Sequence, residues 1–327
     1  MKIMFYDTKP YDKIWFQPLG EEMGYKIKFQ EVKLNEDTAI LAKNYDAVCI
    51  FVNDDAGKET IKTLKKLGVR TILLRCAGFN NVDLKAAKEA DIKVLRVPSY
   101  SPEAVAEYAM GLLLTVNRNI HRAYVRTRDF NYNINGLMGI DLVGKTAGVI
   151  GTGKIGQMMI DILKGFKMHI LAYDPYPVKG LDAEYVDLDR LFRESDVISL
   201  HCPLTKDTRH IINKKNIEKM KDGVLLVNTS RGGLINTGDL IEALMARKFA
   251  GVGLDVYEEE DEYFFEDKSN DIITDEDLIR LTSFRNVILT SHQAFFTRDA
   301  MEAIAKVTME NARAVEEGTD LKNQVLP

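Results

Sequence analysis

The chain has 327 residues, 46% of them hydrophobic, and a formal net charge of −5. This length leaves room for two domains, and the composition is that of a globular protein. The negative balance argues against nucleic acid as a partner. The N-terminal MKIMFYDTK is typical of a strand rather than a signal peptide, and the most hydrophobic helical run, Ala109–Val116, is too short to span a bilayer. We therefore expect a cytoplasmic protein with no membrane partner.

The three cysteines, Cys49, Cys76 and Cys202, lie far apart in the sequence. None forms a CxxC pair, and no histidine lies at metal-ligand spacing from them. Each lies in an apolar, strand-like setting, which favours a buried free thiol. We expect neither a disulfide nor a metal site.

The first hundred residues alternate strand and helix patterns, which predicts a small open α/β sheet. The loop Arg75–Asn81 contains the small residues Ala77 and Gly78, whose backbone N–H groups could hold a carboxylate, although small residues are common in any loop. The predicted strands are Lys2–Tyr6, Tyr25–Phe29, Ala47–Phe51, Thr71–Arg75 and Lys93–Val97, and the predicted helices include Glu59–Leu67 and Leu84–Ala90.

The segment Val97–Pro102 has two prolines on either side of Tyr100 and is typical of a stiff connector. A long helix is predicted to follow it, from Glu103 to Arg128. The first half of this helix is apolar on nearly every side, so it must be covered on more than one face. One cover is its own domain, and we expect the other to be a second subunit, giving a homodimer or homotetramer.

The stretch Lys145–Pro175 contains a strand, a glycine turn and a helix in that order. The apolar strand Thr146–Ile150 leads into Gly151, Gly153 and Gly156. These glycines allow the tight turn, the approach of backbone to a pyrophosphate, and close packing of helix on strand. The pattern predicts a dinucleotide site with the phosphates at the helix N-terminus.

A second apolar strand, His169–Tyr173, ends in Asp174. An acid at this distance from the glycines accepts hydrogen bonds from the adenosine ribose. Because its carboxylate repels a 2′-phosphate, NAD is favoured over NADP.

Four further strands are predicted in the second half of the chain, and polar residues follow each of them. Ligands of such sheets bind outside the carboxyl ends of the strands, so these residues are expected to converge on one crevice. The strands are Asp196–Leu200, Gly223–Val227, Gly251–Val256 and Asn286–Thr290.

Hydride transfer between nicotinamide and a carbonyl requires a proton donor, a cation and orientation. Arg231 suits the cation role through its planar set of donors, although it could instead cap the next helix. His292 suits the acid role because histidine is the side chain that ordinarily gains and loses a proton near neutral pH, although a lone histidine after a strand is often structural. A carboxylate beside His292 would favour the imidazolium, and the residues leave Glu258, Glu259 and Glu260 open for this role.

Near the C-terminus, Asp261–Asp277 is an acidic insertion with aromatic residues, for which we expect a solvated surface loop, with a lid or subunit contact as the alternative. The predicted helix Thr297–Glu317 returns to the first domain. The predicted domains are therefore residues 1–99 with 297–327, and residues 100–296, with two crossings that would act as a hinge.

The whole chain resembles the D-2-hydroxyacid dehydrogenase family, and within it the fermentative bacterial D-lactate dehydrogenases. The resemblance implies two Rossmann-like or flavodoxin-like parallel-sheet domains with a cleft between them, the first domain being discontinuous. It rests on the motifs LRCAGFNNVD (74–83), VPSYSPEAVAEYA (97–109), KTAGVIGTGKIG (145–156), DVISLHCPLT (196–205), VNTSRGGLI (227–235), GVGLDVYEEE (251–260) and HQAF from His292.

The resemblance also implies roles for single residues. The catalytic residues would be Arg231, Glu260 and His292, which resolves the choice among the glutamates. Ala77 and Gly78 would bind the substrate carboxylate together with Arg231, with Tyr100 close by. The implied NAD contacts, including the glycines above, are Gly151, Gly153, Lys154, Ile155, Gly156, Asp174, Cys202, Pro203, Thr208, Thr229, Ser230 and Asp255.

The implied activity is reduction of pyruvate to D-lactate with NADH. Phe51 stands where some lactate enzymes of the family have tyrosine, which leaves a bulkier 2-keto acid or hydroxypyruvate as an alternative substrate. Glu260 argues against the related formate dehydrogenases, which carry glutamine there. A non-enzymatic NAD-sensing protein with the same fold is the alternative from a different class.

Overall fold

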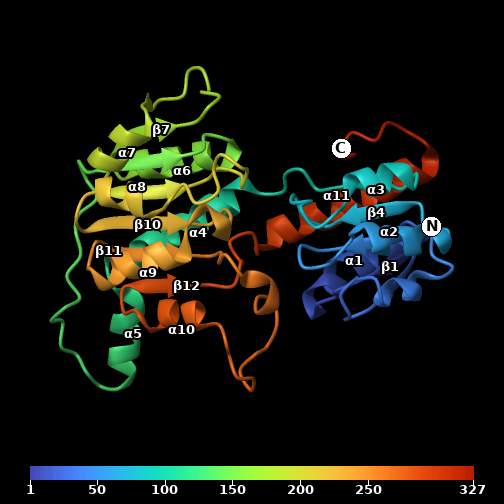
Figure 1. The fold of residues 1–327 in the computed structure, drawn as a ribbon, viewed down its shortest axis with the longest axis horizontal. Coiled ribbons are helices and arrows are strands. Elements are labelled where there is room, and N and C mark those ends of the chain that lie inside the picture. The colour runs from blue at the N-terminus through green and yellow to red at the C-terminus, as the bar shows by residue number, and fades with distance from the viewer. The chain divides into compact units, whose positions relative to one another are not determined.

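In a computed structural model that describes residues 1–327, the chain divides into two compact units (Figure 1). The first unit consists of Met1–Ser101 and Phe296–Pro327, and the second of Pro102–Phe295. The chain therefore passes from one unit to the other at Ser101–Pro102 and again at Phe295–Phe296.

The first unit contains a five-stranded sheet in which all strands are parallel. Its inner strands are apolar and fully buried, as expected for a parallel sheet covered on both faces. The order is that of a flavodoxin-like sheet. From one edge to the other the strands are β2 (Lys26–Phe29), β1 (Lys2–Phe5), β3 (Ala47–Ile50), β4 (Thr71–Leu74) and β5 (Lys93–Leu95).

The C-terminal helix α11 belongs to the first unit, where it packs against α1. Thr297 caps its N-terminus by accepting a hydrogen bond from the Ala300 N–H, and Gly318 ends it at a φ of 67°. The sequence analysis did not predict α1. The helices of this unit are α1 (Pro10–Glu22), η1 (Thr38–Ala42), α2 (Lys58–Lys66), α3 (Leu84–Glu89) and α11 (Arg298–Glu317).

The second unit contains a seven-stranded parallel sheet. Its order is that of a Rossmann sheet extended by one strand, so the direction of winding reverses between β6 and β9, where such folds bind their ligands. The strands in spatial order are β12 (Val287–Leu289), β11 (Phe249–Leu254), β10 (Val224–Asn228), β9 (Val197–Leu200), β6 (Thr146–Ile150), β7 (His169–Tyr173) and β8 (Glu184–Tyr185).

Helices cover this sheet, and two clusters of buried apolar side chains form its core. One cluster joins α4 and α6 to the sheet, and these helices lie together in Figure 1. The helices are α4 (Pro102–Asn117), α5 (Ile120–Arg128), α6 (Lys154–Gly165), α7 (Leu188–Glu194), α8 (Lys214–Lys219), η2 (Gly232–Leu234), α9 (Thr237–Met245), η3 (Glu260–Glu262) and α10 (Glu276–Ser283). None is long and apolar enough to cross a membrane.

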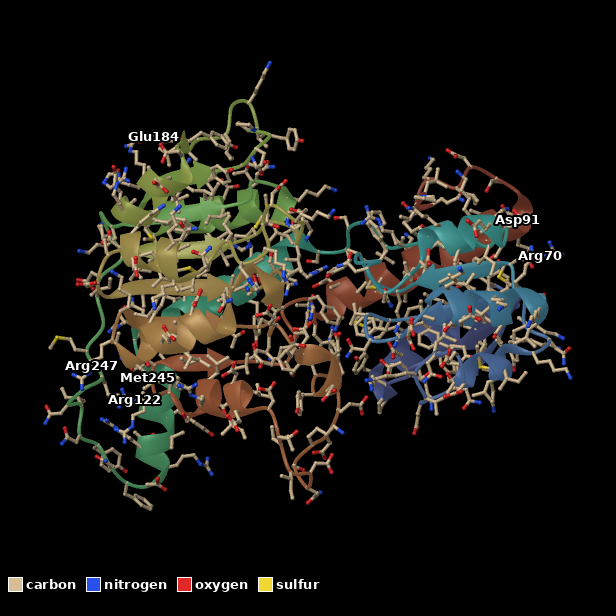
Figure 2. All side chains as sticks on the ribbon, in the orientation of Figure 1. Arg70, Asp91, Arg122, Glu184, Met245 and Arg247 are labelled. Atoms are coloured by element: carbon tan, nitrogen blue, oxygen red, sulfur yellow. The ribbon has the colours of Figure 1, made fainter.

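The predicted long helix Glu103–Arg128 is wrong, because the chain breaks it into α4 and α5. Asn119 adopts the left-handed conformation at a φ of 52°, which asparagine tolerates better than most residues. The reason given for a second subunit also fails, because α4 is buried mainly within its own unit. None of the residues of α5 is buried, and Arg122 projects from it in Figure 2.

The insertion Asp261–Asp277 is only partly the solvated loop that the sequence predicted. Phe264 is buried, and Tyr263 and Phe265 pack against the core of the second unit. Residues 269–272 remain exposed. The aromatic half of the insertion is therefore part of the folded unit.

Candidate active site

His292 and Glu260 form a close pair at the carboxyl edge of the second sheet. The His292 Nδ1 lies 2.6 Å from the Glu260 Oε1, and both side chains are less than one-fifth exposed. The second carboxylate oxygen of Glu260 accepts a hydrogen bond from the Tyr257 N–H at 2.9 Å. Because the carboxylate can only accept, it fixes the proton on Nδ1 and leaves Nε2 to exchange a proton with a reactant.

Asp255 organises the turn that carries His292. Its carboxylate accepts hydrogen bonds from the Thr290 hydroxyl at 2.6 Å and from the N–H groups of Gln293 and Ala294 at 3.0 and 2.7 Å. The His292 N–H donates to the Asp255 carbonyl at 2.7 Å. Burial raises the pKa of the Asp255 carboxyl. The sequence analysis gave Asp255 only as an implied NAD contact, with no sign of this positioning role.

Arg231 follows β10 and lies at the same edge of the sheet as His292, which follows β12. One strand, β11, separates β10 from β12, so the two strand ends are about 10 Å apart. The Asn228 side-chain amide donates to the Arg231 carbonyl at 2.8 Å, and the guanidinium donates to the Ser230 carbonyl at 2.6 Å. The Arg231 side chain is partly exposed, and it follows a strand that ends at the same edge of the sheet as the His292–Glu260 pair.

The glycine turn before α6 has the shape that a bound pyrophosphate needs. Gly151 has a φ of 95°, and a Cβ there would lie 2.5 Å from the His201 carbonyl oxygen. A Cβ on Gly156 would lie 2.0 Å from the Gly151 oxygen, whereas one on Gly153 would meet nothing within 4 Å. No side chain caps the helix at Gly153, so no capping group competes with a phosphate for the N–H groups that begin α6, at Lys154 and Ile155.

Asp174 lies at the end of β7 and is tied to the glycine turn. Its Oδ2 accepts a hydrogen bond from the Thr152 N–H at 2.7 Å, and its Oδ1 accepts one from the Tyr176 N–H at 2.8 Å. Oδ2 also accepts a hydrogen bond from the Thr152 hydroxyl at 3.2 Å, so the remaining acceptor capacity for a ribose hydroxyl is on Oδ1. The glycine turn before α6 and Asp174 together fit a dinucleotide.

The remaining predicted NAD contacts follow β9 and β10. Burial raises the pKa of the Cys202 thiol to about 11, so it stays protonated. The Thr208 hydroxyl donates to the Pro203 carbonyl at 2.6 Å and closes that loop. The Thr229 hydroxyl is buried without a partner, next to Ser230, which leaves a polar atom for a ligand to satisfy.

A family model described as "D-isomer specific 2-hydroxyacid dehydrogenase, NAD binding domain" matches residues 110–294. The chain belongs to this family. The D-lactate dehydrogenase of Escherichia coli is 54% identical over 100% of both chains. The apo structure of D-lactate dehydrogenase from Escherichia coli matches with a TM-score of 0.91 at 50% identity over 100% of both chains. A structure described as the pyruvate reductase of Chlamydomonas reinhardtii matches with a TM-score of 0.93 at 41% identity, covering 99% of this chain and 98% of that one.

This dehydrogenase is therefore an NAD-dependent oxidoreductase, and the matched region lies within the second unit. The predicted substrate residues Ala77, Gly78 and Tyr100 lie in the first unit, and all three are partly exposed. The Arg96 guanidinium donates to the Ala77 carbonyl at 2.8 Å and lies 5.1 Å from the Phe79 ring centre. These contacts fix the loop that contains Ala77 and Gly78.

A buried ionic cluster at the ends of β1, β3 and β4 also supports that loop, and the sequence analysis missed it. Arg75 is 3% exposed, donates to the Asp7 carbonyl at 2.7 Å and lies 4.6 Å from the Phe51 ring centre. Its Nε lies 3.4 Å from Asp12. Burial raises the pKa of Asp54 to about 7. An arginine directly after the wholly apolar strand TILL was the available signal, since a buried guanidinium needs carboxylate partners.

Proposed function

We propose that this dehydrogenase reduces pyruvate to D-lactate with NADH and that His292 is its acid–base residue. The observation that carries the proposal is the His292–Glu260 pair, at 2.6 Å, on the carboxyl edge of an NAD-binding sheet. A histidine with one nitrogen bound to a carboxylate can give up a proton from the other nitrogen.

Residues of this chain supply the proton for the carbonyl oxygen and orient the group that gives it. When bound, NADH supplies the hydride that is added to C2 of the keto acid. The protonated His292 gives its Nε2 proton to the carbonyl oxygen, so the new hydroxyl forms as the imidazole becomes neutral. Glu260 stabilises the imidazolium before this transfer, and Tyr257 orients Glu260.

We assign substrate binding to Arg231 together with the first unit. The guanidinium would bind the carboxylate and polarise the ketone oxygen. We also assign the N–H groups of Ala77 and Gly78, and Tyr100, to binding of the substrate carboxylate. On this proposal residues 1–99 and 297–327 form the substrate-binding domain and residues 100–296 the NAD-binding domain.

The test is NADH oxidation with a panel of 2-keto acids of increasing side-chain size, including hydroxypyruvate, followed by chiral chromatography of the product. We expect the highest kcat/KM with pyruvate and D-lactate as the only enantiomer. A higher kcat/KM with a bulkier acid would favour the alternative dehydrogenase activity. Turnover with none of them would favour a protein that only senses NAD.

We further propose that the enzyme works in the cytoplasm as a homodimer or homotetramer. Cys49, Cys76 and Cys202 are all buried free thiols, which suits a reducing compartment. The support for self-association is the set of exposed apolar residues on α5 and in residues 130–143.

A further inference from the structure

The run Glu258–Glu260 contains three identical side chains in three different environments. Glu260 binds His292, as described above. The Glu258 Oε1 lies 2.6 Å from the Nε2 of His210 and 3.1 Å from a guanidinium nitrogen of Arg209. Glu259, between them, is exposed. The unit therefore contains a second histidine–glutamate pair, two residues away from the first.

The Glu258 pair joins three segments that each contain a proposed site residue. Through His210 it holds the loop of Thr208, and its Oε2 lies 3.3 Å from the hydroxyl of Thr237, at the start of α9. Thr237 follows the Arg231 loop in sequence, and Glu258 itself precedes Glu260. The carboxylate is only 14% exposed, so its contacts with these partners replace hydrogen bonds that it would make to water.

The Arg231 loop also packs directly on the segment that leads to Glu260. A Cβ on Gly232 would lie 2.1 Å from the Tyr257 carbonyl carbon, so the two backbones are in contact. The Tyr257 N–H in turn donates to Glu260. The N–H of His210 donates to the Gly233 carbonyl at 2.9 Å, and His210 has a φ of 52°. Such a backbone conformation persists only where its surroundings hold it.

We propose that Glu258 is a positioning residue, which fixes the Arg231 loop relative to the Glu260–His292 pair. The inference rests on the proposed function, because it assigns a role toward those three residues. Contact between Gly232 and Tyr257 sets the distance between the Arg231 loop and the segment that leads to Glu260. Glu258 belongs to that segment and fixes its position by binding His210 and Thr237. Removing it would leave His210 unpaired and both loops free to shift. A displacement of about 1 Å can reduce turnover about 100-fold.

The kinetic test compares Glu258→Ala, Glu258→Gln and the matched control Glu259→Ala. We expect Glu258→Ala to lower kcat about 10- to 100-fold and to change KM for NADH less than kcat, since the glycine turn is not touched and only the Thr208 loop loses a contact. Glu258→Gln should recover most of the loss because it keeps acceptor Oε1. Glu259→Ala should match the wild type. A loss of thermal stability in Glu258→Ala without a loss of kcat would overturn the proposal.

A second readout uses the enzyme without NADH or substrate. The chain has only five histidines, so the imidazole NMR signals of His292 can be assigned by its substitution. Glu258→Ala should shift them, and Glu259→Ala should not. Unchanged His292 signals would contradict the inference even if no keto acid proved to be a substrate, so this outcome is separate from failure of the proposed function. If Glu258→Ala does not fold, His210→Gln decides by the same two measurements: a fall in kcat with shifted His292 signals would support the inference, and no change in either would overturn it.

Discussion

The conformation of His292 is set by its neighbours rather than by its own preference. Its φ of 53° is uncommon for a residue with a side chain, and the backbone bond to Asp255 and the side-chain bond to Glu260 hold it there. Because Glu260 binds Nδ1, it does not compete with a substrate for Nε2. The imidazole is therefore oriented for proton transfer before substrate arrives.

Replacing His292 with alanine should lower kcat by 10²- to 10⁴-fold, because general acid catalysis typically contributes that much. The measurement is steady-state reduction of pyruvate, with NADH affinity measured by fluorescence titration as the control. That affinity should be unchanged, since the glycine turn does not involve His292. Near-normal turnover in the variant would remove His292 from the mechanism.

Asp174 should select against NADPH through its charge. Asp174→Asn can still accept the hydrogen bond from Thr152, but it no longer repels a 2′-phosphate. We expect the ratio of kcat/KM for NADH to that for NADPH to fall about tenfold, which corresponds to roughly 1.4 kcal/mol of charge repulsion. Asp182→Asn, at a highly exposed acid outside the glycine turn, is the control. An unchanged ratio in Asp174→Asn would show that another residue selects the cofactor.

At the scale of elements, the end of β9 contains a histidine that should make stability depend on pH. His201 is 8% exposed; its Nε2 lies 2.8 Å from the Ser199 hydroxyl, and its Nδ1 has no partner. Burial lowers its pKa to about 4 from 6.5. Between these values the unfolded chain binds a proton that the folded chain does not, so stability falls as the pH drops from 6.5 to 4, by at most about 3 kcal/mol.

His201→Asn should therefore lose less stability than the wild type between pH 6.5 and pH 4, as measured by urea unfolding. The comparison between variants is needed because Asp54 acts in the opposite direction. Its pKa is raised by burial to about 7, so its stabilising effect is lost as the pH rises through 7. His169→Asn, at an exposed histidine, should leave the pH dependence unchanged. Equal slopes for wild type and His201→Asn would contradict the assignment.

The sequence predicted elements well where local pattern and tertiary structure agree. The strands from Thr146 to Ile150 and from His169 to Tyr173 have the predicted limits, because apolar β-branched runs between glycine and charged residues have one favourable conformation. The break at Asn119 was missed because it depends on a single left-handed residue. Helix α1, which contains Pro18, was not among the helices that the sequence analysis named.

The candidate site was predictable only in part, because a pattern places residues along the chain and not the contacts between side chains. The residues alone left Glu258, Glu259 and Glu260 equivalent, and the geometry distinguishes all three. The roles of Asp255 and Arg75 depend on partners far away in the sequence. No period or spacing in the chain predicts such contacts.

At the scale of the whole molecule, one surface remains unexplained by the fold of a single chain. Helix α5 has nine residues, none of them buried, and a helix this short is not stable in isolation. Arg126 donates to the carbonyls of Asn133 and Asn135 at 3.0 and 2.9 Å, so the following loop is held against the helix. The exposed large apolar residues of this region are Ile120, Tyr124, Val125, Phe130, Tyr132, Ile134, Met138, Ile140 and Val143.

A concentration of exposed large apolar residues in one region favours a protein interface, and a second copy of the chain is the partner we expect. Sedimentation velocity should give a dimer or tetramer for the wild type, and Tyr132→Asp combined with Ile134→Asp should shift it toward the monomer, because a buried unpaired carboxylate opposes association. Ile14→Asp, at an exposed apolar residue outside this region, should leave the assembly unchanged. A monomeric wild type at working concentration would refute the interface, whereas loss of assembly in all variants would show only that added charge is not tolerated.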